Sequence, residues 1–143
     1  MRILGIDYGD ARVGIAITDE LNITVQGLET IQRNGSDKIV LRRLDEILEK
    51  YDVDTIVVGM PLNMNGTISD RAKITQEFIH KLKCKYNKLK IDWIDERLTT
   101  VEAHKTMNFL DINKNKKRNI VDTISAVYIL ETYLNKIKNS VEK

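Results

Sequence analysis

Cysteine is almost missing from this sequence, and its scarcity limits the classes of protein to which the chain can belong. Cys84 is the single cysteine, so no disulfide can form within the chain, which fits a reducing compartment. No apolar run approaches the roughly 18 residues needed to span a bilayer. The N-terminus opens into an apolar strand and not into a basic-then-apolar signal segment. We therefore expect a cytoplasmic protein with no membrane partner.

Aromatic residues and net charge are also in short supply. Aromatics make up 6% of the chain, which disfavours stacking on nucleobases as the main mode of binding. The net charge of +2 says little about partners, but the basic residues are distributed unevenly. Lys114, Lys116, Lys117 and Arg118 form a cluster that can attract phosphates even in a nearly neutral protein. The alternative is that this cluster is simply a solvated loop.

The chain of 143 residues fits one domain with its own core, and no linker or repeat divides residues 1–143. Apolar stretches predict five strands, over residues 2–8, 12–19, 23–32, 54–60 and 90–95. Helical spacing predicts a helix that Ser36 caps and that ends near 51, and three further helices, from after the 61–66 loop to about 84, from 99 to about 110 and from 120 to 138. The polar stretch 111–118 is expected to be a mobile loop.

The apolar spacing also predicts which helical faces pack inward. The first helix is expected to bury Val40, Leu44, Ile47, Leu48 and Tyr51. The second is expected to bury Ile74, Phe78 and Leu82. The last is expected to bury Ile120, Ile124, Val127, either Leu130 or Glu131, Leu134 and Ile137.

This order of elements predicts an α/β fold with a mixed five-stranded sheet flanked by helices. The first three strands are close enough in sequence to pair antiparallel. The first, fourth and fifth are expected to be parallel, because helical crossovers join them. Ligands of such sheets bind beyond the carboxyl ends of the parallel strands.

Asp7 is the most informative residue, because it interrupts the apolar strand of residues 3–9 near its carboxyl end. An ionised carboxylate in a buried strand is costly unless it is paired or holds a metal ion. Two more acids stand at comparable places: Glu96 follows the strand of residues 90–95, and Asp122 lies in the first turn of the last helix. Carboxylate oxygens suit Mg²⁺ or Mn²⁺, and two such ions about 4 Å apart can hydrolyse a phosphodiester.

Each acid also has a structural explanation. Asp7 could end its strand in a turn and pair with Arg12, and Glu96 could form a surface salt bridge. Asp122 could cap the last helix together with Asn119. The residues expected to contact substrate phosphates are Arg12, Arg97, Thr99, Thr100, Lys116, Lys117 and Arg118, although Thr99 could instead cap a helix.

Four stretches resemble ordered motifs of a known family. Residues 6–16 (IDYGDARVGIA) resemble the opening motif of the YqgF family, also called RuvX. Residues 58–67 (VGMPLNMNGT), 95–100 (DERLTT) and 122–130 (DTISAVYIL) resemble its later blocks in the same order. The resemblance covers nearly the whole chain, and four ordered blocks are far more specific than one.

The resemblance implies a ribonuclease H-like fold, similar to Holliday junction resolvases. It implies a nuclease that processes the 5′ end of pre-16S ribosomal RNA, with Asp7, Glu96 and Asp122 as metal-binding acids. Structured RNA, and ribosomal precursor particles that contain it, are then the expected partners of a monomer or homodimer. Related nucleases usually use four acids, and the candidates for a fourth are Asp10, Asp19 and Asp95.

Other functions stay open. A resolvase of branched DNA could use the same site and would be expected to form a two-fold dimer. A non-catalytic RNA-binding factor of ribosome assembly could rely on the basic cluster alone. A nucleotide binder related to actin or sugar kinases would need two domains of this kind, and the chain has room for one.

Overall fold

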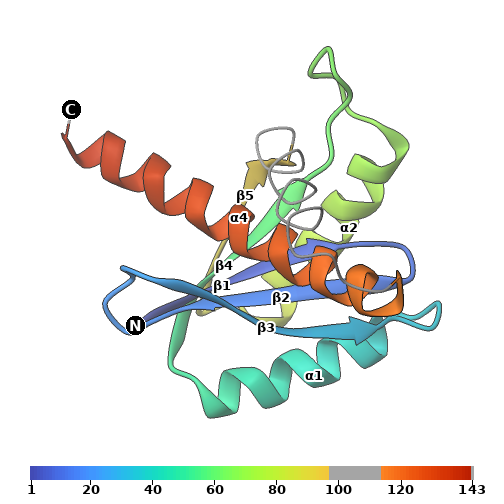
Figure 1. Cartoon of the computed structure of the whole chain (residues 1–143), viewed down its shortest axis with the longest axis horizontal. Helices are drawn as coiled ribbons and strands as arrows, with labels where there is room; N and C mark the ends of the chain where they lie inside the picture. The colour runs from blue at the N-terminus through green and yellow to red at the C-terminus, as the bar shows by residue number, and fades with distance from the viewer. Residues whose placement is uncertain (97–113, 143) are drawn as a thin grey trace.

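The computed structural model describes the backbone of residues 1–96 and 114–142, and the side chains of residues 1–96 and 123–138 (Figure 1). Its elements are β1 (Arg2–Tyr8), β2 (Arg12–Thr18), β3 (Val25–Gln32), α1 (Asp37–Lys50), β4 (Val53–Met60), α2 (Asp70–Lys85), β5 (Lys90–Asp95) and α4 (Lys114–Glu142). The five expected strands are confirmed. They form one sheet in the order β3-β2-β1-β4-β5. As expected, β1–β2 and β2–β3 pair antiparallel, whereas β1–β4 and β4–β5 pair parallel.

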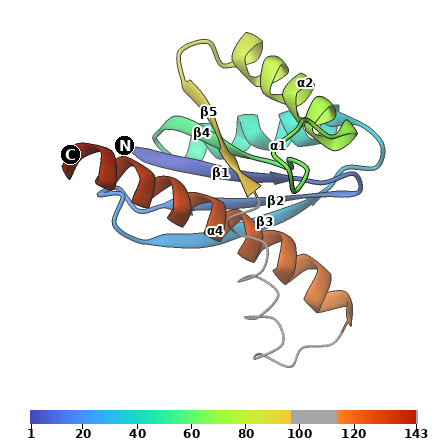
Figure 2. The same cartoon turned by 90° about the horizontal axis from the view of Figure 1, so that it is seen from above.

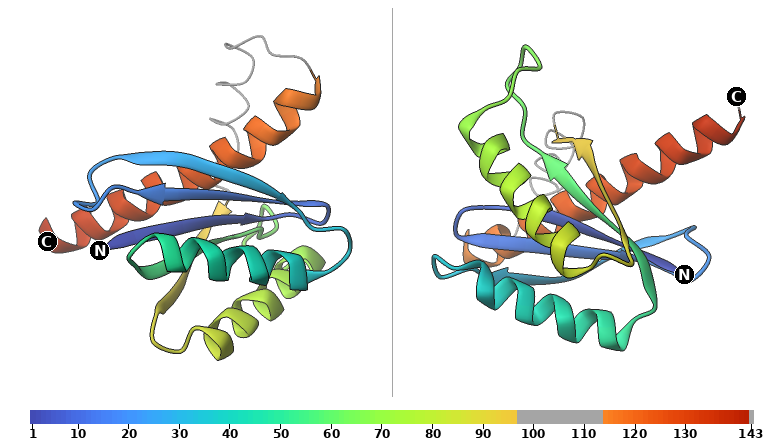
Figure 3. Two further views of the ribbon diagram at one scale, coloured as in Figure 1. Left: turned by 90° about the horizontal axis from the view of Figure 1, so that it is seen from below. Right: turned by 180° about the vertical axis from the view of Figure 1, so that it is seen from behind.

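The sheet is covered on both faces, with α1 and α2 on one side and α4 on the other (Figure 2). Side chains alternate between these faces along each strand. In β1, Leu4, Ile6 and Tyr8 pack into the core beneath α1 and α2, whereas Ile3 packs into the smaller core beneath α4. The views from below and from behind show the same three layers (Figure 3).

Helix α1 begins as expected, because the Ser36 side chain accepts a hydrogen bond from the Lys38 N–H. Val40, Leu44 and Ile47 are buried as predicted. In α2, Phe78 and Leu82 are buried, but the prediction for Ile74 is wrong, since its side chain is 42% exposed. The buried stripe of α2 is centred on Thr75 and Ile79, so position 74 falls at its edge.

Helix α4 starts earlier than expected, at Lys114, and it ends at Glu142. The expected loop is therefore wrong for residues 114–118; residues 111–113 and the helix expected at 99–110 lie outside the described residues. Lysine and arginine have good intrinsic helix propensity, and neither glycine nor proline interrupts this stretch. A polar sequence thus did not imply a loop.

The inner face of α4 also differs from the prediction. Ala126, Ile129, Leu130 and Tyr133 are buried, so only Leu130 of the expected stripe is fully buried among the described side chains. Ile124, Val127 and Leu134 are half-buried, and Ile137 is 39% exposed. The stripe that was predicted followed the large aliphatic residues, but close contact with the sheet favours the small Ala126 instead.

Two glycines allow this close contact. A Cβ atom added to Gly5 of β1 would lie 2.5 Å from Leu130 Cγ and 3.1 Å from the Ala126 carbonyl oxygen. A Cβ atom added to Gly59 of β4 would lie 2.6 Å from Ile129 Cδ1. The backbone of α4 is therefore set close to β1 and β4. None of the helices in the described part of the chain is long and apolar enough to cross a membrane.

Candidate metal centre

Asp7 lies near the carboxyl end of β1, on the side of the sheet that α4 covers. Alternation along β1 places it on the same face as Ile3 and Gly5. It pairs in register with Gly14 of β2. On its other side, the pairing of Ile6 with Val58 makes Gly59 the adjacent residue of β4. The half-buried Asp7 carboxylate therefore has a glycine beside it on each of the two neighbouring strands.

Glu96 comes directly after β5 and turns toward the same face. Ile94, two residues earlier, packs in the core beneath α4. The Glu96 carboxyl carbon lies 3.5 Å from where a Cβ atom on Gly59 would stand. Asp7 and Glu96 thus flank Gly59 on the α4 side, at the carboxyl edge of the parallel strands. Both acids also make interactions of their own within the protein.

Asp122 lies in α4, one helical turn before Ala126, which crosses β1 at Gly5. The next residue, Thr123, is placed over β3, with its Oγ1 atom 2.9 Å from Thr30 Oγ1. Within α4 the described side chains begin at Thr123, so the Asp122 carboxylate lies outside them. Among the described residues, no group of three acids, histidines or cysteines is close enough to hold a metal ion.

The expected phosphate contacts are only partly described. Arg12 opens β2 at the same edge as Asp7, and the Gly9 N–H donates to the Arg12 carbonyl oxygen at 3.0 Å to close the β1–β2 turn. Lys116, Lys117 and Arg118 belong to the first turns of α4, and their side chains lie outside the described part. Arg97, Thr99 and Thr100 lie wholly outside the described residues.

A polar cluster that the sequence analysis missed holds the end of β1 from the opposite face. The Tyr8 hydroxyl donates to Asp37 Oδ1 at 2.5 Å, and its ring stacks on Phe78 with 4.1 Å between centroids. Arg33 Nε donates to the same Asp37 oxygen at 2.9 Å, and Lys81 Nζ donates to the other at 2.8 Å. Tyr8, the residue next to Asp7, is therefore held by contacts with α1 and α2.

These contacts shift the pKa values of the groups involved. Burial and the hydrogen bond to Asp37 raise the pKa of Tyr8 well above its usual range. Burial alone would raise the pKa of Asp37, but the hydrogen bonds from Lys81, Tyr8 and Arg33 outweigh it and lower the pKa. Tyr8 is thus neutral and Asp37 ionised at neutral pH. The only sequence signal for Asp37 was its place in the first turn of a helix, which helix capping already explains.

Arg71 of α2 reinforces the same strand end. Its Nη2 atom donates to the Tyr8 carbonyl oxygen at 3.1 Å, and its Nη1 atom donates to Asp10 Oδ2 at 3.1 Å. Arg33 Nη1 donates to the Asp10 carbonyl oxygen at 3.1 Å. The β1–β2 turn is therefore tied to two other segments, which gives Asp7 a rigid support.

The candidates for a fourth acid lie in different environments. Asp10 is in the ion pair with Arg71. Asp19 lies at the other end of the sheet, where its side chain accepts hydrogen bonds from the Ile23 and Thr24 N–H groups. Asp95 pairs in register with Met60, which packs in the core beneath α1 and α2. Alternation therefore places Asp95 on the face opposite to Glu96.

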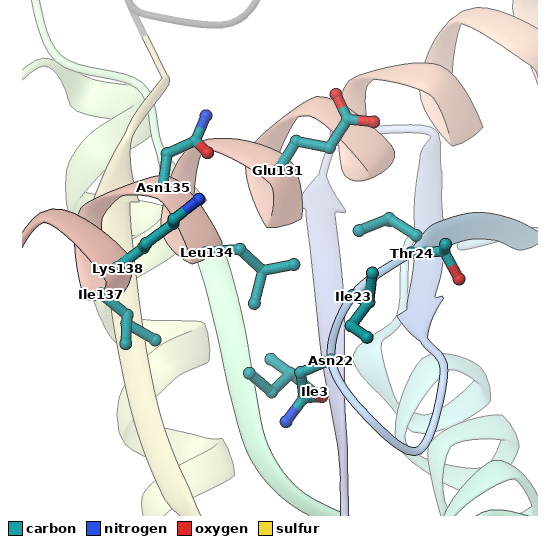
Figure 4. A pocket seen from close by; sticks show the side chains of 10 residues that line it. Ile3, Asn22, Ile23, Thr24, Glu131, Leu134, Asn135, Ile137 and Lys138 are labelled. Carbon is teal, nitrogen blue, oxygen red and sulfur yellow. The ribbon is translucent and has the colours of Figure 1, made fainter. Parts of the chain in front are cut away.

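A cavity of about 870 Å³ lies at the end of β1 opposite to Asp7, and Figure 4 shows the side chains that line it. It is bounded by Ile3 at the start of β1, by Ile23 in the β2–β3 loop, and by Leu134 and Ile137 near the end of α4. Asp7 stands at the opposite end of β1, so this cavity is separate from the candidate metal centre.

A family model described as RuvX, Holliday junction resolvase, matches residues 1–136. The chain belongs to the RuvX family. A relative from Ruminiclostridium cellulolyticum is 54% identical over 137 residues, which cover 96% of this chain and 96% of the relative. A RuvX relative from Acetivibrio thermocellus is 49% identical over 135 residues, which cover 94% and 96%. Both bear the name "Putative pre-16S rRNA nuclease".

Solved structures agree with the fold expected of RuvX. RuvC from T. thermophilus, in complex with a Holliday junction substrate, superposes with a TM-score of 0.56 at 11% identity, covering 96% of each chain. A second structure of Thermus thermophilus RuvC gives 0.55 at 10% identity, covering 96% of this chain and 97% of the other. At such identities the similarity shows the fold alone, and the expected ribonuclease H-like fold is confirmed.

Proposed function

We propose that this chain is a metal-dependent nuclease that hydrolyses phosphodiester bonds in structured RNA, with the 5′ end of pre-16S ribosomal RNA as its substrate. The observation that carries the proposal is the placement of Asp7 and Glu96 on either side of Gly59. Both acids lie on the α4 face of the ribonuclease H-like sheet, at the carboxyl ends of its parallel strands. The proposed substrate is supported by the name of two relatives that are 54% and 49% identical.

The residues at this edge suit Mg²⁺ or Mn²⁺. Carboxylate oxygens are the ligands these hard ions prefer, and the residues beside Asp7 on both neighbouring strands are glycines, which add no side chain of their own next to its carboxylate. We assign Asp7, Glu96 and Asp122 to two ions. Asp122 is included because helical spacing puts it in the same row as Ala126 and Ile129, which face the sheet. Bound ions would neutralise the developing charge on the phosphate and lower the pKa of water.

The chain's own contribution is to hold the acids rigidly and to bring in the substrate. Asp7 is supported by the contacts of Tyr8 with Asp37 and by the hydrogen bond from Arg71 to the Tyr8 carbonyl oxygen. Fixed carboxylates need no reorganisation when the reaction occurs. Arg12 stands at the same edge and is proposed to contact a phosphate of the RNA. The remaining proposed phosphate contacts are Arg97, Thr99, Thr100, Lys116, Lys117 and Arg118.

A second candidate function is the resolution of four-way DNA junctions. It is favoured by the description of the matching family model and by the fold shared with RuvC. The same three acids would act, but a symmetric pair of cuts would require a two-fold dimer. A ribosome-assembly factor that only binds RNA would instead need the basic residues and none of the acids.

Cleavage assays separate these functions. Purified protein in Mg²⁺ or Mn²⁺ is offered a pre-16S RNA fragment and a four-way DNA junction side by side, and Asp7→Asn protein is the control. We expect RNA cleavage that the Asp7→Asn variant loses by at least about a thousand-fold. Junction cleavage alone, from a dimer, would replace the RNA proposal with the resolvase. Equal RNA cleavage by the Asp7→Asn variant would refute the assignment of the site.

A further inference from the structure

A cavity lies near the carboxyl ends of β4 and β5, on the face of the sheet opposite to the candidate metal centre and beneath α2. It has a volume of about 460 Å³ and opens between α2, β5 and the loop that follows β4. Its lining includes Met60, Ile68, His80, Lys83 and Trp93. We call this cavity the Trp93 groove. Its volume lies in the range of small-ligand sites and is sufficient for one nucleotide.

Trp93 is the single tryptophan of the chain, and its side chain is 45% exposed. It belongs to β5, which is one of the two edge strands of the described sheet. The neighbouring Ile94 is buried in the core beneath α4, so Trp93 points to the α2 side, where α2 covers it only in part. A large aromatic side chain exposed beside a cavity indicates a binding surface more strongly than a scattered exposed aliphatic does.

The lining favours a nucleic acid over a basic or purely apolar partner. Lys83 brings a positive charge and His80 brings ring nitrogens, one of which lies 3.6 Å from Cys84 Sγ. None of the described residues that line the groove has a carboxylate. An indole face beside a cationic side chain matches an unpaired base and its phosphate, because every base has a face that can stack on an aromatic ring.

The groove is also close to the candidate metal centre along the chain. Met60 lines the groove and pairs in register with Asp95, the residue before Glu96. Trp93 is three residues from Glu96, or roughly 10 Å along an extended strand. A single strand that crosses this edge of the sheet could therefore reach both places within a few nucleotides.

We propose that the Trp93 groove binds one unpaired base of a single-stranded segment of the substrate, stacked on Trp93, a few nucleotides from the cleaved bond. The proposal rests on the nuclease function for its biological role. Base binding by the groove can nevertheless be measured without cleavage. A chain poor in aromatics would then use one stacking position to set register and not a continuous stacking platform.

The single tryptophan makes the test direct, because all indole fluorescence comes from this groove. Wild-type protein in EDTA is titrated with a hexamer of adenylate RNA, and the control is a hexamer of abasic ribose phosphates. We expect saturable quenching by the adenylate hexamer and none by the abasic one. Binding of the hexamer, followed by anisotropy of an end label, with no change in Trp93 emission would refute the subsite.

Two matched substitutions then separate stacking from apolar contact. Trp93→Leu keeps apolar bulk but loses the aromatic face, so hexamer binding should weaken about ten-fold or more. Trp93→Tyr keeps a face and should stay within about three-fold of wild type. Lys83→Gln should reduce the slope of log affinity against log salt by about one. Equal affinity for the Leu and Tyr variants, with unchanged melting temperatures, would leave this surface as a protein-docking face.

Steady-state kinetics distinguish failure of this proposal from failure of the nuclease proposal. Trp93→Leu should raise KM and leave kcat unchanged, whereas Asp7→Asn should lower kcat and keep hexamer quenching. Quenching without any cleavage would support the subsite and contradict the nuclease. Normal cleavage with an unchanged KM in Trp93→Leu would support the nuclease and contradict the subsite.

Discussion

Adding one methyl group at Gly59 tests the packing beneath the candidate site. A Cβ atom there would lie 2.6 Å from Ile129 Cδ1 and 3.2 Å from Ile129 Cγ1, whereas carbon atoms in contact prefer about 3.5–4.0 Å. Overpacking of this kind costs about 1–3 kcal/mol. A strain-free Gly→Ala change would instead stabilise the protein by about 0.4–1 kcal/mol. We therefore expect Gly59→Ala to lower the free energy of unfolding by about 1–2 kcal/mol.

A double-mutant cycle locates the cause of that loss. Ile129→Val removes Cδ1, the atom nearest to the new methyl group, and should by itself cost about 0.5–1.5 kcal/mol. In the double variant the added methyl group occupies part of the space that Cδ1 leaves. Its destabilisation should therefore be smaller than the sum of the single effects by about 1 kcal/mol.

Urea unfolding followed by circular dichroism measures all four corners of the cycle, and the melting temperature of Gly59→Ala should fall by about 3–8 °C. Two outcomes would refute the reasoning. One is a Gly59→Ala variant as stable as wild type or more so. The other is additivity of the two substitutions within about 0.3 kcal/mol, because it would mean that Ile129 does not lie over Gly59.

Three further predictions concern the polar contacts around the sheet. Asp37→Asn should destabilise the fold by about 2 kcal/mol in urea, because it removes the half-buried charge to which Arg33 and Lys81 donate hydrogen bonds; a loss below about 0.5 kcal/mol would contradict this. The lowered pKa of Asp37 stabilises the fold above its ordinary value of 3.8 and loses that effect as pH falls through the lowered pKa, so Asp37→Asn should show a flatter acid limb in a pH series of unfolding. Burial and the hydrogen bond to Asp92 raise the pKa of Tyr133 to about 12, so its contribution is complete below pH 10.0 and should be lost as pH rises through 12. Tyr133→Phe should remove this alkaline component, and an unchanged alkaline limb would contradict it.

Local sequence signals were sufficient for the sheet. The strands are short and bounded by turns or helices, and the continuous apolar run of β1 was enough to single out Asp7 as an unusual carboxylate. The placement of Glu96 at the same edge followed from the rule that parallel strands end together. These predictions succeeded because each depends on residues that are close in sequence or on a general rule of sheet topology.

Most of the wrong or missed predictions depend on contacts between residues far apart in the sequence, which local spacing cannot predict. Which face of α4 packs inward is decided by Gly5 and Gly59, on strands far from α4 in sequence. The hydrogen bond from Tyr8 to Asp37 joins residues 29 positions apart, and either residue alone had an ordinary explanation. The polar residues 114–118 predict a loop because loops are rich in polar residues, but a helix can be equally polar, and these residues are helical.

The most direct test of the metal centre compares neighbouring acids on opposite faces of β5. Cleavage of a pre-16S RNA fragment is measured against Mn²⁺ concentration for wild type, Glu96→Gln and Asp95→Asn. The account predicts that Glu96→Gln loses at least about a hundred-fold in cleavage rate at saturating Mn²⁺ or needs far more Mn²⁺, whereas Asp95→Asn follows the wild-type curve. A Glu96→Gln variant with the wild-type Mn²⁺ dependence and rate would contradict the assignment of this edge as the catalytic metal centre.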